Sequence, residues 1–486
     1  MKFFCIIFLA FFPALTVCAQ TRNVVTGSYE QDSIERANFY NKSFHSEIKN
    51  FLTAKPLTDF YGLDKKGFQL SPLTEISAGR QSEGGQNFLY NTFLGVSGTY
   101  YYKKKLTVSA NVFGGYTNPL NHRATLADYL GWFPQLGDFQ KNNDRYFIKY
   151  FEFYVNYRPA DFLLLSFGKG KKHVGEGLRS VILSSSNSGM YYFDLRVDVK
   201  NFAYVFSVNG GKNLDTKLQK NKTKWTVYHL FSWNIAKWLS VGGFEAVNLV
   251  RRDSLNNSRF VDLHYLNPLI FTRPVEYSLG SPDNELMGVF GKLKFFNQTF
   301  YGQVMIDEFK IKEITANTGW WANKYSIQAG VKGFFLKCFS YLLEAGYIRP
   351  YMYSHDDANN SYSIYNQPFA NPYGANLKEL TAQVKYSSKV FSADLTFDYV
   401  SQGKDFGDKY SYGGNVLRSY NDRRHNYNNS VGQGRSTKIA NFLVNLSFSP
   451  KFFRNFCLFS QTGVFDGNKF FVLGIKTNFI GFDRSF

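Results

Sequence analysis

The chain of 486 residues is poor in cysteine, with 4, and in proline, with 13, against 40 glycines. So few cysteines in so long a chain exclude the disulfide framework of a small secreted domain. No Cys and His spacing matches a zinc site, and neither a Gly-x-Ser-x-Gly elbow nor a phosphate-binding loop occurs. After the first twenty residues there is no uninterrupted apolar stretch of about 18 residues, which excludes a spanning helix there.

The first residues are typical of a secretory signal peptide. Lys2 gives a charged start, residues 3–17 are largely apolar, and the small residues up to Ala19 offer a cleavage site. We therefore expect residues 1–19 to be removed on export, with cleavage near Ala19.

The exported chain is basic and keeps two cysteines. The sequence holds 37 Asp and Glu against 56 Lys and Arg, a formal net charge of +19. Export argues against nucleic acid as a partner. The phosphates of lipopolysaccharide and acidic polysaccharides are the partners that this charge favours. The remaining Cys338 and Cys457 form either one disulfide or two free thiols.

Aromatic residues are abundant: 51 Phe and 34 Tyr accompany a mean hydropathy of only −0.29. Many strands with one apolar and one polar face would combine these two properties. Strict alternation of apolar and polar residues appears in 325–335, 377–386, 391–401 and 438–448. Their polar faces carry Asp, Glu, Lys and Gln, which suits a wet lumen better than a packed core.

About 18 segments of this kind can be counted along the chain. They lie near 68–80, 88–102, 105–117, 146–158, 161–169, 190–198, 201–209, 223–234, 237–250, 286–297, 299–313, 323–336, 338–353, 376–389, 391–402, 437–449, 454–465 and 468–480.

The connections between these segments alternate in length. Short links lie at 103–105, 159–160, 200, 235–236, 337, 390 and 450–453, and long ones at 118–145, 170–189, 210–222, 251–285, 354–375 and 403–436. Outer-membrane barrels have short periplasmic turns and longer outer loops. The sequence therefore predicts an all-β fold: a transmembrane outer-membrane β-barrel of antiparallel strands over residues 67–486.

Residues 20–66 stand apart from the strand pattern. They are polar and charged with scattered apolar residues, so they form either short helices or a flexible leader. We expect a periplasmic segment that can plug the barrel mouth. The terminal Phe486 resembles the signal read by the barrel-assembly machinery, which is the expected partner during biogenesis.

Residues 168–187 differ from an ordinary outer loop. Lys169, Lys171, His173 and Arg179 stand among glycines that would let the backbone fold inward, with basic groups over the lumen. The alternative is a solvated loop whose glycines are turn residues.

Residues 264–284 are too apolar for a free loop in water. We expect this segment to fold into the lumen as a plug or constriction. Arg273 and Glu276 would then pair, because charges placed inside need partners.

Further along, Asp307 and Glu308 are expected on opposite faces of one strand. Trp320 and Trp321 lie in the following outer connection. They belong either to an aromatic girdle at the membrane interface or to a platform on which sugar rings stack.

Nucleophilic catalysis needs a Ser or Cys beside a His base that a third group orients. The adjacent pair His45-Ser46 lies in the leader, so we expect no enzyme activity and no metal or other cofactor.

Three runs of residues resemble a known family: GKGKKHVGEGLRSVILSSSN (168–187), HYLNPLIFTRPVEYSLGSPDN (264–284) and YGQVMIDEFKI with the following GWWANK (301–324). They look like the Wzi-type capsule-assembly family, and more closely like its Bacteroidetes relatives, some of them associated with gliding motility. The resemblance covers roughly residues 67–486. It implies a monomeric, periplasmically plugged outer-membrane barrel that retains capsular polysaccharide without catalysis.

The leading hypothesis is a non-enzymatic barrel of the cell outer membrane that binds or anchors an acidic exported polysaccharide. The candidate ligand-binding residues are Lys169, Lys171, His173, Arg179, Arg273, Trp320 and Trp321. Two alternatives stay open: a component of gliding or adhesion machinery, and an anion-selective diffusion channel.

Overall fold

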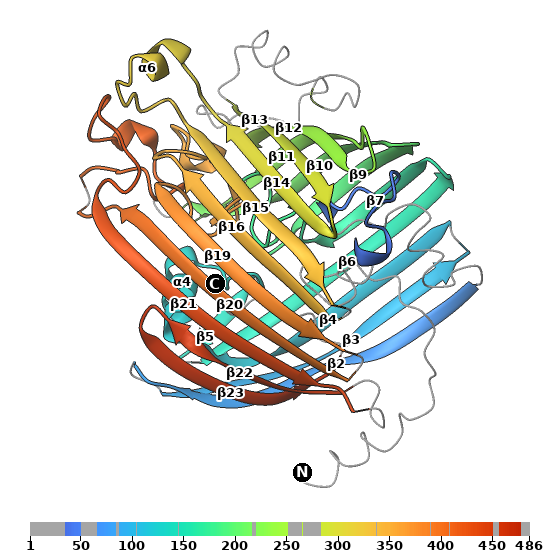
Figure 1. Cartoon of the computed structure of the whole chain (residues 1–486). Helices are drawn as coiled ribbons and strands as arrows, with labels where there is room; N and C mark the ends of the chain where they lie inside the picture. Colours follow the sequence, from blue (N-terminus) through green and yellow to red (C-terminus); the bar gives the residue numbers. More distant parts are fainter. Residues whose placement is uncertain are drawn as a thin grey trace.

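The computed structural model describes residues 35–49, 66–83, 87–103, 105–143, 145–215, 220–250, 265, 283–336, 338–388, 390–407, 409–450 and 456–477. These residues form a closed barrel of 18 antiparallel strands (Figure 1), which confirms the predicted fold class. The signal peptide, Phe486 and nearly all of the segment 264–284, with Arg273 and Glu276, lie outside the described residues, so the lumenal fold expected for that segment stays a prediction.

The barrel strands pair with their neighbours in chain order. They are β2 (Lys66–Gln81), β3 (Phe88–Tyr102), β4 (Leu106–Asn118), β6 (Arg145–Ala160), β7 (Leu163–Gly170), β9 (Met190–Val199), β10 (Phe202–Asp215), β11 (Lys220–Trp233), β12 (Leu239–Val250), β13 (Asn284–Phe295), β14 (Gln298–Ile306), β15 (Tyr325–Phe335), β16 (Phe339–Ile348), β19 (Leu377–Ser387), β20 (Phe391–Lys404), β21 (Arg435–Phe448), β22 (Cys457–Phe465) and β23 (Asn468–Lys476). β2 pairs with both β3 and β23, which closes the sheet, and the short β5 (Phe139–Asn142) pairs with β6.

Alternation along the strands separates an outer from an inner face. On β19, Leu380 and Val384 are each 41% exposed, whereas Glu379 and Thr381 are buried inside the barrel. Because successive side chains point to opposite faces, one register places the apolar set outward and the polar set in the lumen.

The connections at one end of the barrel are short. Phe296 and Asn297 join β13 to β14 with φ of 44° and 62°, the two positive values of a type I′ turn, which matches the twist of the flanking strands. By the rule for outer-membrane barrels, this is the periplasmic end, and the end with the long connections is the outer end.

Three predicted boundaries were wrong. The long connection expected at 210–222 is mostly strand, because β10 runs to Asp215 and β11 starts at Lys220. The strands expected at 299–313 and 338–353 end earlier, at Ile306 and Ile348. Beyond Ile348 the aromatic residues continue at alternate positions, but they belong to turns that fold into the barrel.

Among the described residues, two α-helices lie in connections at the outer end: α4 (Asn121–Leu130) and α6 (Ile311–Thr315). α4 packs inside the barrel through Ala127, and Gly131 ends it in the left-handed conformation with its N–H bonded to the Ala127 carbonyl. Across the described ranges, no helix combines the length and apolarity that a membrane crossing requires.

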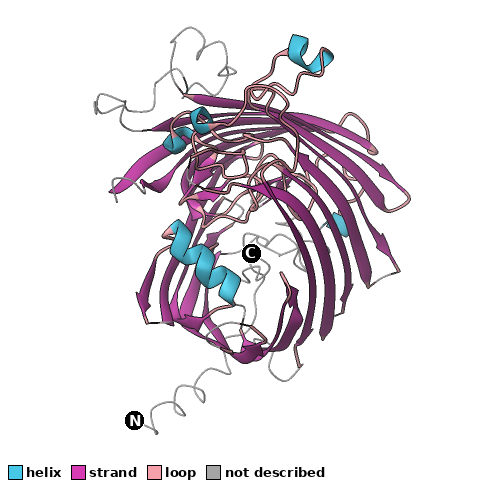
Figure 2. Cartoon of the chain, turned by 90° about the vertical axis from the view of Figure 1, so that its left-hand side faces the viewer, coloured by secondary structure: helices cyan, strands magenta, loops and turns pink. Residues whose placement is uncertain are grey.

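The barrel interior is occupied rather than open on the side of β7 to β20. Figure 2 shows loop segments gathered within the barrel, with the longest helix running along its inner wall. Short strand pairs stabilise these segments: β1 (Ile48–Lys49) with β8 (His173–Val174), and β17 (Ser363–Ile364) with β18 (Gln367–Pro368). Both Cys338 and Cys457 are free thiols.

Candidate functional site

The connection between β7 and β9, residues 171–189, folds back into the barrel. Val181, Ile182 and Leu183 are fully buried and belong to one apolar cluster with inward side chains of β10 to β13. At Gly175 φ is +133°, and a Cβ there would collide with the Gln303 amide, so this bend needs glycine. The loop therefore lies against the inner wall.

Arg179 fixes this loop to the opposite wall. Its NH2 lies 2.9 Å from Asp398 Oδ2, and its NH1 lies 3.4 Å from Glu379 Oε2 and 3.0 Å from Thr381 Oγ1. Glu344 accepts the backbone N–H of Arg179 at 3.2 Å. Because Arg179 is only 1% exposed, these partners replace the water that a guanidinium otherwise binds.

Three carboxylates and three ammonium groups form a buried network near the periplasmic end, called here the lumenal ion network: Glu35, Glu47, Glu176, Lys49, Lys292 and Lys332. Lys292 bonds Glu47 and lies 2.8 Å from Glu176, whose other oxygen lies 2.6 Å from Lys332. Lys332 also lies 2.5 Å from Glu35. The network joins the segment 35–49, the loop 171–189 and the wall strands β13 and β15.

The charges in this network stabilise one another in the ionised form. Burial opposes ionisation of Glu47, but Lys292 and His45 outweigh it and lower the pKa of this carboxyl. Burial likewise opposes ionisation of Glu176, and Lys292 and Lys332 hold its pKa well below the usual range. A separate contact reinforces the junction, because Arg36 donates to the carbonyl of Leu336 in a periplasmic turn.

A second connection, residues 349–376, also folds inward. Tyr362, Ile364 and Phe369 are each 1% exposed and pack in the same apolar cluster as the loop 171–189. The hydroxyl of Tyr353 donates to the carbonyl of Val181 at 2.8 Å. The two loops therefore support each other in the lumen.

Aromatic residues from three connections meet at the outer end, called here the outer aromatic cluster: Trp320, Trp321, Tyr351, Tyr420 and Tyr427. Ring centroids lie 4.9 Å apart for Trp320 and Tyr427 and 4.7 Å apart for Trp321 and Tyr420. Tyr427 is 47% exposed, whereas Trp321 is 9% exposed and its Nε1–H has no hydrogen-bond partner among the described residues. The cluster thus combines an exposed ring with an indole N–H that has no hydrogen-bond partner among the described residues.

Cations surround these rings. The guanidinium of Arg423 lies 4.3 Å from the Trp321 ring centroid, and the ammonium of Lys310 lies 5.4 Å from that of Trp320. Such contacts are attractive because the face of an aromatic ring carries a negative electrostatic potential. In binding sites, aromatic faces contact the apolar faces of sugar rings. Hydrogen-bond donors beside them bind sugar hydroxyls and carboxylates.

Asp307 and Glu308 do not occupy opposite faces of a strand, contrary to the expectation. β14 has ended before them, so both reach the same ammonium, that of Lys324, at 2.9 Å. Burial raises the pKa of Asp307 to about 7 in spite of this ammonium.

The predicted ligand-binding residues are not brought together. Lys169 points outward from β7, its ammonium 5.5 Å from the Tyr191 ring, and Lys171 lies half-buried where the loop begins. His173 and Arg179 are fully buried inside the barrel, so the expected patch of basic groups facing a glycan is not formed. The loop lies inside the barrel because buried carboxylates of the wall form ion pairs with its Arg179.

Trp320 and Trp321 do lie at the outer end, as the sequence indicated, but their partners were missed. Arg423, Tyr420 and Tyr427 belong to the connection 405–434, which lies within the long link expected at 403–436 and has no apolar periodicity. The chain is held there by backbone bonds, such as Trp321 N–H to Asn426 O at 2.9 Å. The many Tyr and Arg residues of this connection were the signal from which its part in the cluster could have been predicted.

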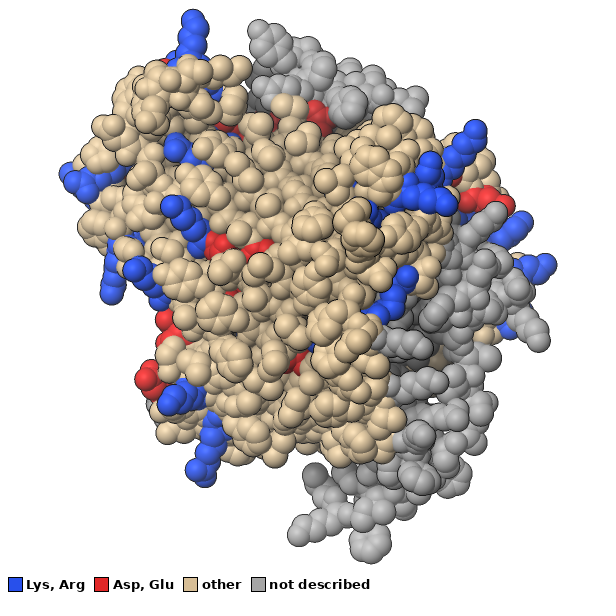
Figure 3. Space-filling view, viewed as in Figure 1, with Lys and Arg blue, Asp and Glu red and all other residues tan. Residues whose placement is uncertain are grey.

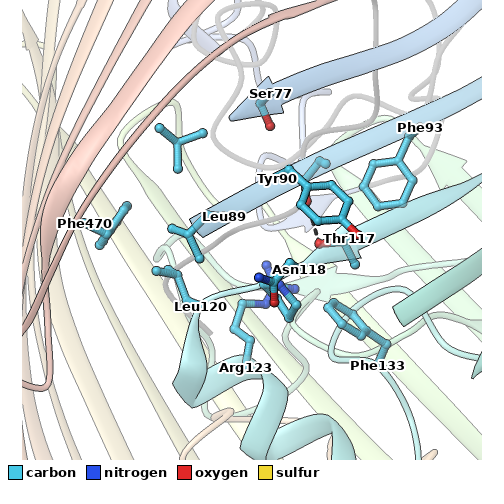
Figure 4. A pocket seen from close by; sticks show the side chains of 13 residues that line it. Ser77, Leu89, Tyr90, Phe93, Thr117, Asn118, Leu120, Arg123, Phe133 and Phe470 are labelled. Carbon is cyan, nitrogen blue, oxygen red and sulfur yellow. Dashed lines mark hydrogen bonds between the residues drawn. The ribbon is translucent and has the colours of Figure 1, made fainter. Parts of the chain in front are cut away.

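A small cavity of about 30 Å³ lies beneath α4, between β2, β3, β4 and β23. Figure 4 shows Arg123 reaching toward it from the helix, with Phe133 and Phe470 on either side. Asn91 accepts from Thr117 at 2.6 Å and donates to Glu75 at 2.9 Å. At about 30 Å³ this cavity is too small for a sugar ring, and the polar groups named here already pair with one another.

α4 is expected to loosen as the pH falls below neutral. His122 stacks on Phe465 with centroids 3.6 Å apart, and burial, then the charge of Arg123, lowers its pKa to about 3. Since protonation then favours the undocked state, stability falls as the pH drops below 6.5, by roughly 2 kcal/mol at pH 5. Hydrogen exchange of α4, corrected for intrinsic rates, should be faster at pH 5 than at pH 7.

The control for this effect is His122→Phe, which keeps the stacked ring and removes the proton. Its α4 should exchange at the same corrected rate at both pH values. Equal protection of α4 at pH 5 and pH 7 in the unmodified chain would contradict the assignment.

Within the ranges that the structure covers, no three His, Cys, Asp or Glu side chains gather as a metal ion would require.

No family model matches the chain, and no curated protein matches it in sequence. Among solved structures, it is similar to Wzi of Escherichia coli, an outer-membrane protein involved in group 1 capsule assembly and a carbohydrate-binding β-barrel. The TM-score is 0.54 over 93% of this chain and 89% of that chain, at 12% identity.

Two Pseudomonas aeruginosa proteins are more distant: OccK8 (OprE), and OccK2 (OpdF) solved with glucuronate. They reach TM-scores of 0.44 and 0.45 at 7% identity, over 84% and 85% of this chain and 97% and 98% of theirs, too low to support an inference. Membership of the Wzi-type family stays a prediction. What the comparison establishes is a fold: this chain is an outer-membrane β-barrel built like Wzi.

Proposed function

We propose that this barrel binds an exported polysaccharide at its outer end and holds it at the cell surface, without catalysis. The observation that carries the proposal is the outer aromatic cluster, in which Trp320 lies beside Tyr427. Lys310 lies over the Trp320 ring, and Arg423 lies over the ring of Trp321. Sugar rings stack on such rings through their apolar faces, and the cations suit the carboxylates of an acidic glycan.

The contents of the lumen support binding over free diffusion. The loop 171–189, the connection 349–376 and the segment 35–49 fill the side of the barrel from β7 to β20. We propose that the segment 35–49 acts as the periplasmic plug and that the lumenal ion network holds it in place. Diffusion of anions through this side of the barrel would need these segments to leave the lumen.

The proposal also includes the location, the oligomeric state and the insertion pathway of the protein. The protein resides in the outer membrane after loss of residues 1–19, acts as a monomer, and is inserted by the barrel-assembly machinery. Two properties support the choice of an acidic glycan: the net charge of +19 and the shared fold with a carbohydrate-binding barrel.

The proposal is tested by the distribution of polysaccharide in a clean deletion strain and its parent. We expect the ratio of cell-attached to shed polysaccharide to fall severalfold, while total synthesis is unchanged, because the outer aromatic cluster is lost with the barrel. Complementation with the intact chain should restore the ratio. An unchanged ratio, or an equal loss of attached and shed material, would contradict surface retention.

A further inference from the structure

The outward face of the barrel wall is asymmetric in charge along the membrane normal. Basic residues occupy outward strand positions near the outer end: Arg80, Arg145, Lys149, Lys169, Lys212, Lys378, Lys438 and Lys469. Among the described strands, the periplasmic end shows one such residue, Lys66, and is otherwise lined by residues such as Phe295 and Phe391. Figure 3 shows a wall of mostly uncharged side chains, with Lys and Arg projecting mainly along its margins.

Four of these cations lie on neighbouring parts of the barrel wall, called here the basic arc: Lys378 on β19, Lys438 on β21, Lys469 on β23 and Arg80 on β2. The strands follow in the order β19, β20, β21, β22, β23 and β2, so the three lysines occupy every second strand and Arg80 lies on the strand next to Lys469. The register aligns Lys378 with Ser401 on β20, and Ser401 with Lys438. Since adjacent strands lie about 4.8 Å apart, these two lysines start about 10 Å from each other.

The basic arc has no counter-charge of its own. All four side chains are exposed, and none forms an ion pair within the part of the chain that the structure describes. Lys378 lies 5.8 Å from the Tyr347 ring. The outward carboxylates among the described strand residues, Glu245 and Glu285, are buried and lie on β12 and β13, away from the arc.

A charge that faces lipid is costly unless the side chain reaches the interface, where a long aliphatic stem covers the apolar surface and the head group meets water or an anion. Unpaired cations that lie near one another repel, so an anion that bridges them is favoured. Phosphate bonds such cations strongly.

We propose that the basic arc is a binding site for the phosphate groups of an anionic glycolipid in the outer leaflet. The polar interruption at Ser401 leaves room for a head group between Lys378 and Lys438, and the Tyr347 ring offers it an apolar face. This site lies on the outer wall and does not depend on glycan binding at the outer aromatic cluster.

The test compares lipid bound to the purified barrel. The variant Arg80→Gln, Lys378→Gln, Lys438→Gln, Lys469→Gln is extracted in mild detergent beside the parent, and co-purifying phosphorylated glycolipid is quantified by mass spectrometry. The control neutralises four exposed lysines of the periplasmic turns: Lys103→Gln, Lys105→Gln, Lys200→Gln and Lys237→Gln.

Each cation near an anionic lipid surface contributes about a fivefold increase in binding, so bound lipid should fall by at least ~tenfold in the arc variant. The control should keep the parent's amount. Equal amounts in the arc variant and the parent, or an equal fall in both variants, would overturn the proposal.

A second measurement uses the unmodified barrel and so does not depend on folding of the variant. Lipid A with and without its phosphates is titrated into the barrel, and occupancy is read by native mass spectrometry. Binding of the phosphorylated form alone supports the site. Equal binding of both forms would mean a site for acyl chains and would reject it.

Discussion

Replacing Arg179 by Met is expected to destabilise the barrel by about 3–5 kcal/mol, the usual cost of removing one partner from a buried ion pair. The guanidinium is fully buried between Glu379 and Asp398, at 3.4 and 2.9 Å. Without it, two carboxylates stay in the lumen with no cation against them, and the loop 171–189 loses its attachment to β19 and β20. Urea unfolding followed by tryptophan emission measures the change.

Two further variants separate this effect from a general loss of packing. Lys169→Met removes a cation at the edge of the same loop that points out of the lumen, and it should shift the unfolding free energy by no more than about 0.5 kcal/mol. Adding Glu379→Gln and Asp398→Asn to Arg179→Met should recover part of the loss. A chain with Arg179→Met that unfolds like the parent would show that the loop is not held in this way.

The double substitution Trp320→Ala, Tyr427→Ala is expected to weaken polysaccharide binding by roughly 30-fold, or about 2 kcal/mol, the scale of an aromatic hot spot in an interface. The two ring centroids lie 4.9 Å apart at the outer end, and neither residue contributes to the wall of the barrel. Barrel assembly, judged by the heat-dependent shift on a gel, should therefore persist. Equilibrium titration with the cell's own polysaccharide gives the affinity.

Trp238→Ala is the matched control for this pair. Trp238 is 53% exposed, as an aromatic platform would be, but it follows the turn at the periplasmic end. Its loss should leave the affinity unchanged. If Trp238→Ala weakens binding as much as the double substitution, the ligand does not sit on the outer aromatic cluster.

The wall of the barrel could be predicted from the sequence because a half-buried strand alternates apolar and polar residues, one set for each face. The expected segment 88–102 coincides with β3, and 391–402 lies within β20. Alternation fails where a strand ends without a change of pattern. After β16 the tyrosines 351 and 353 keep the period of a strand, yet both have positive φ and turn inward.

The lumen was harder to predict, because ion pairs across a barrel join residues far apart in the chain. Arg179 was expected to face a glycan, and nothing local shows that Glu379 and Asp398 would meet it. The connection 349–376 was expected at 354–375, as one of the long outer links. Its Tyr362, Ile364 and Phe369 carried the same apolar signal that marked residues 264–284 as a lumenal segment.

The outer aromatic cluster was half predicted. The Trp320-Trp321 pair stood out by itself, but the choice between a membrane girdle and a sugar platform depends on which rings lie beside it. Those rings come from positions 351, 420 and 427, so the cluster exists only after the connections have folded over one another.

The most direct test is a calorimetric titration of the purified barrel with the acidic polysaccharide that its own cells export. The account predicts saturable binding by the parent and by Trp238→Ala, with roughly 30-fold weaker binding by the Trp320→Ala, Tyr427→Ala variant. Saturable binding that is equal in all three, or no binding by the parent, would contradict it.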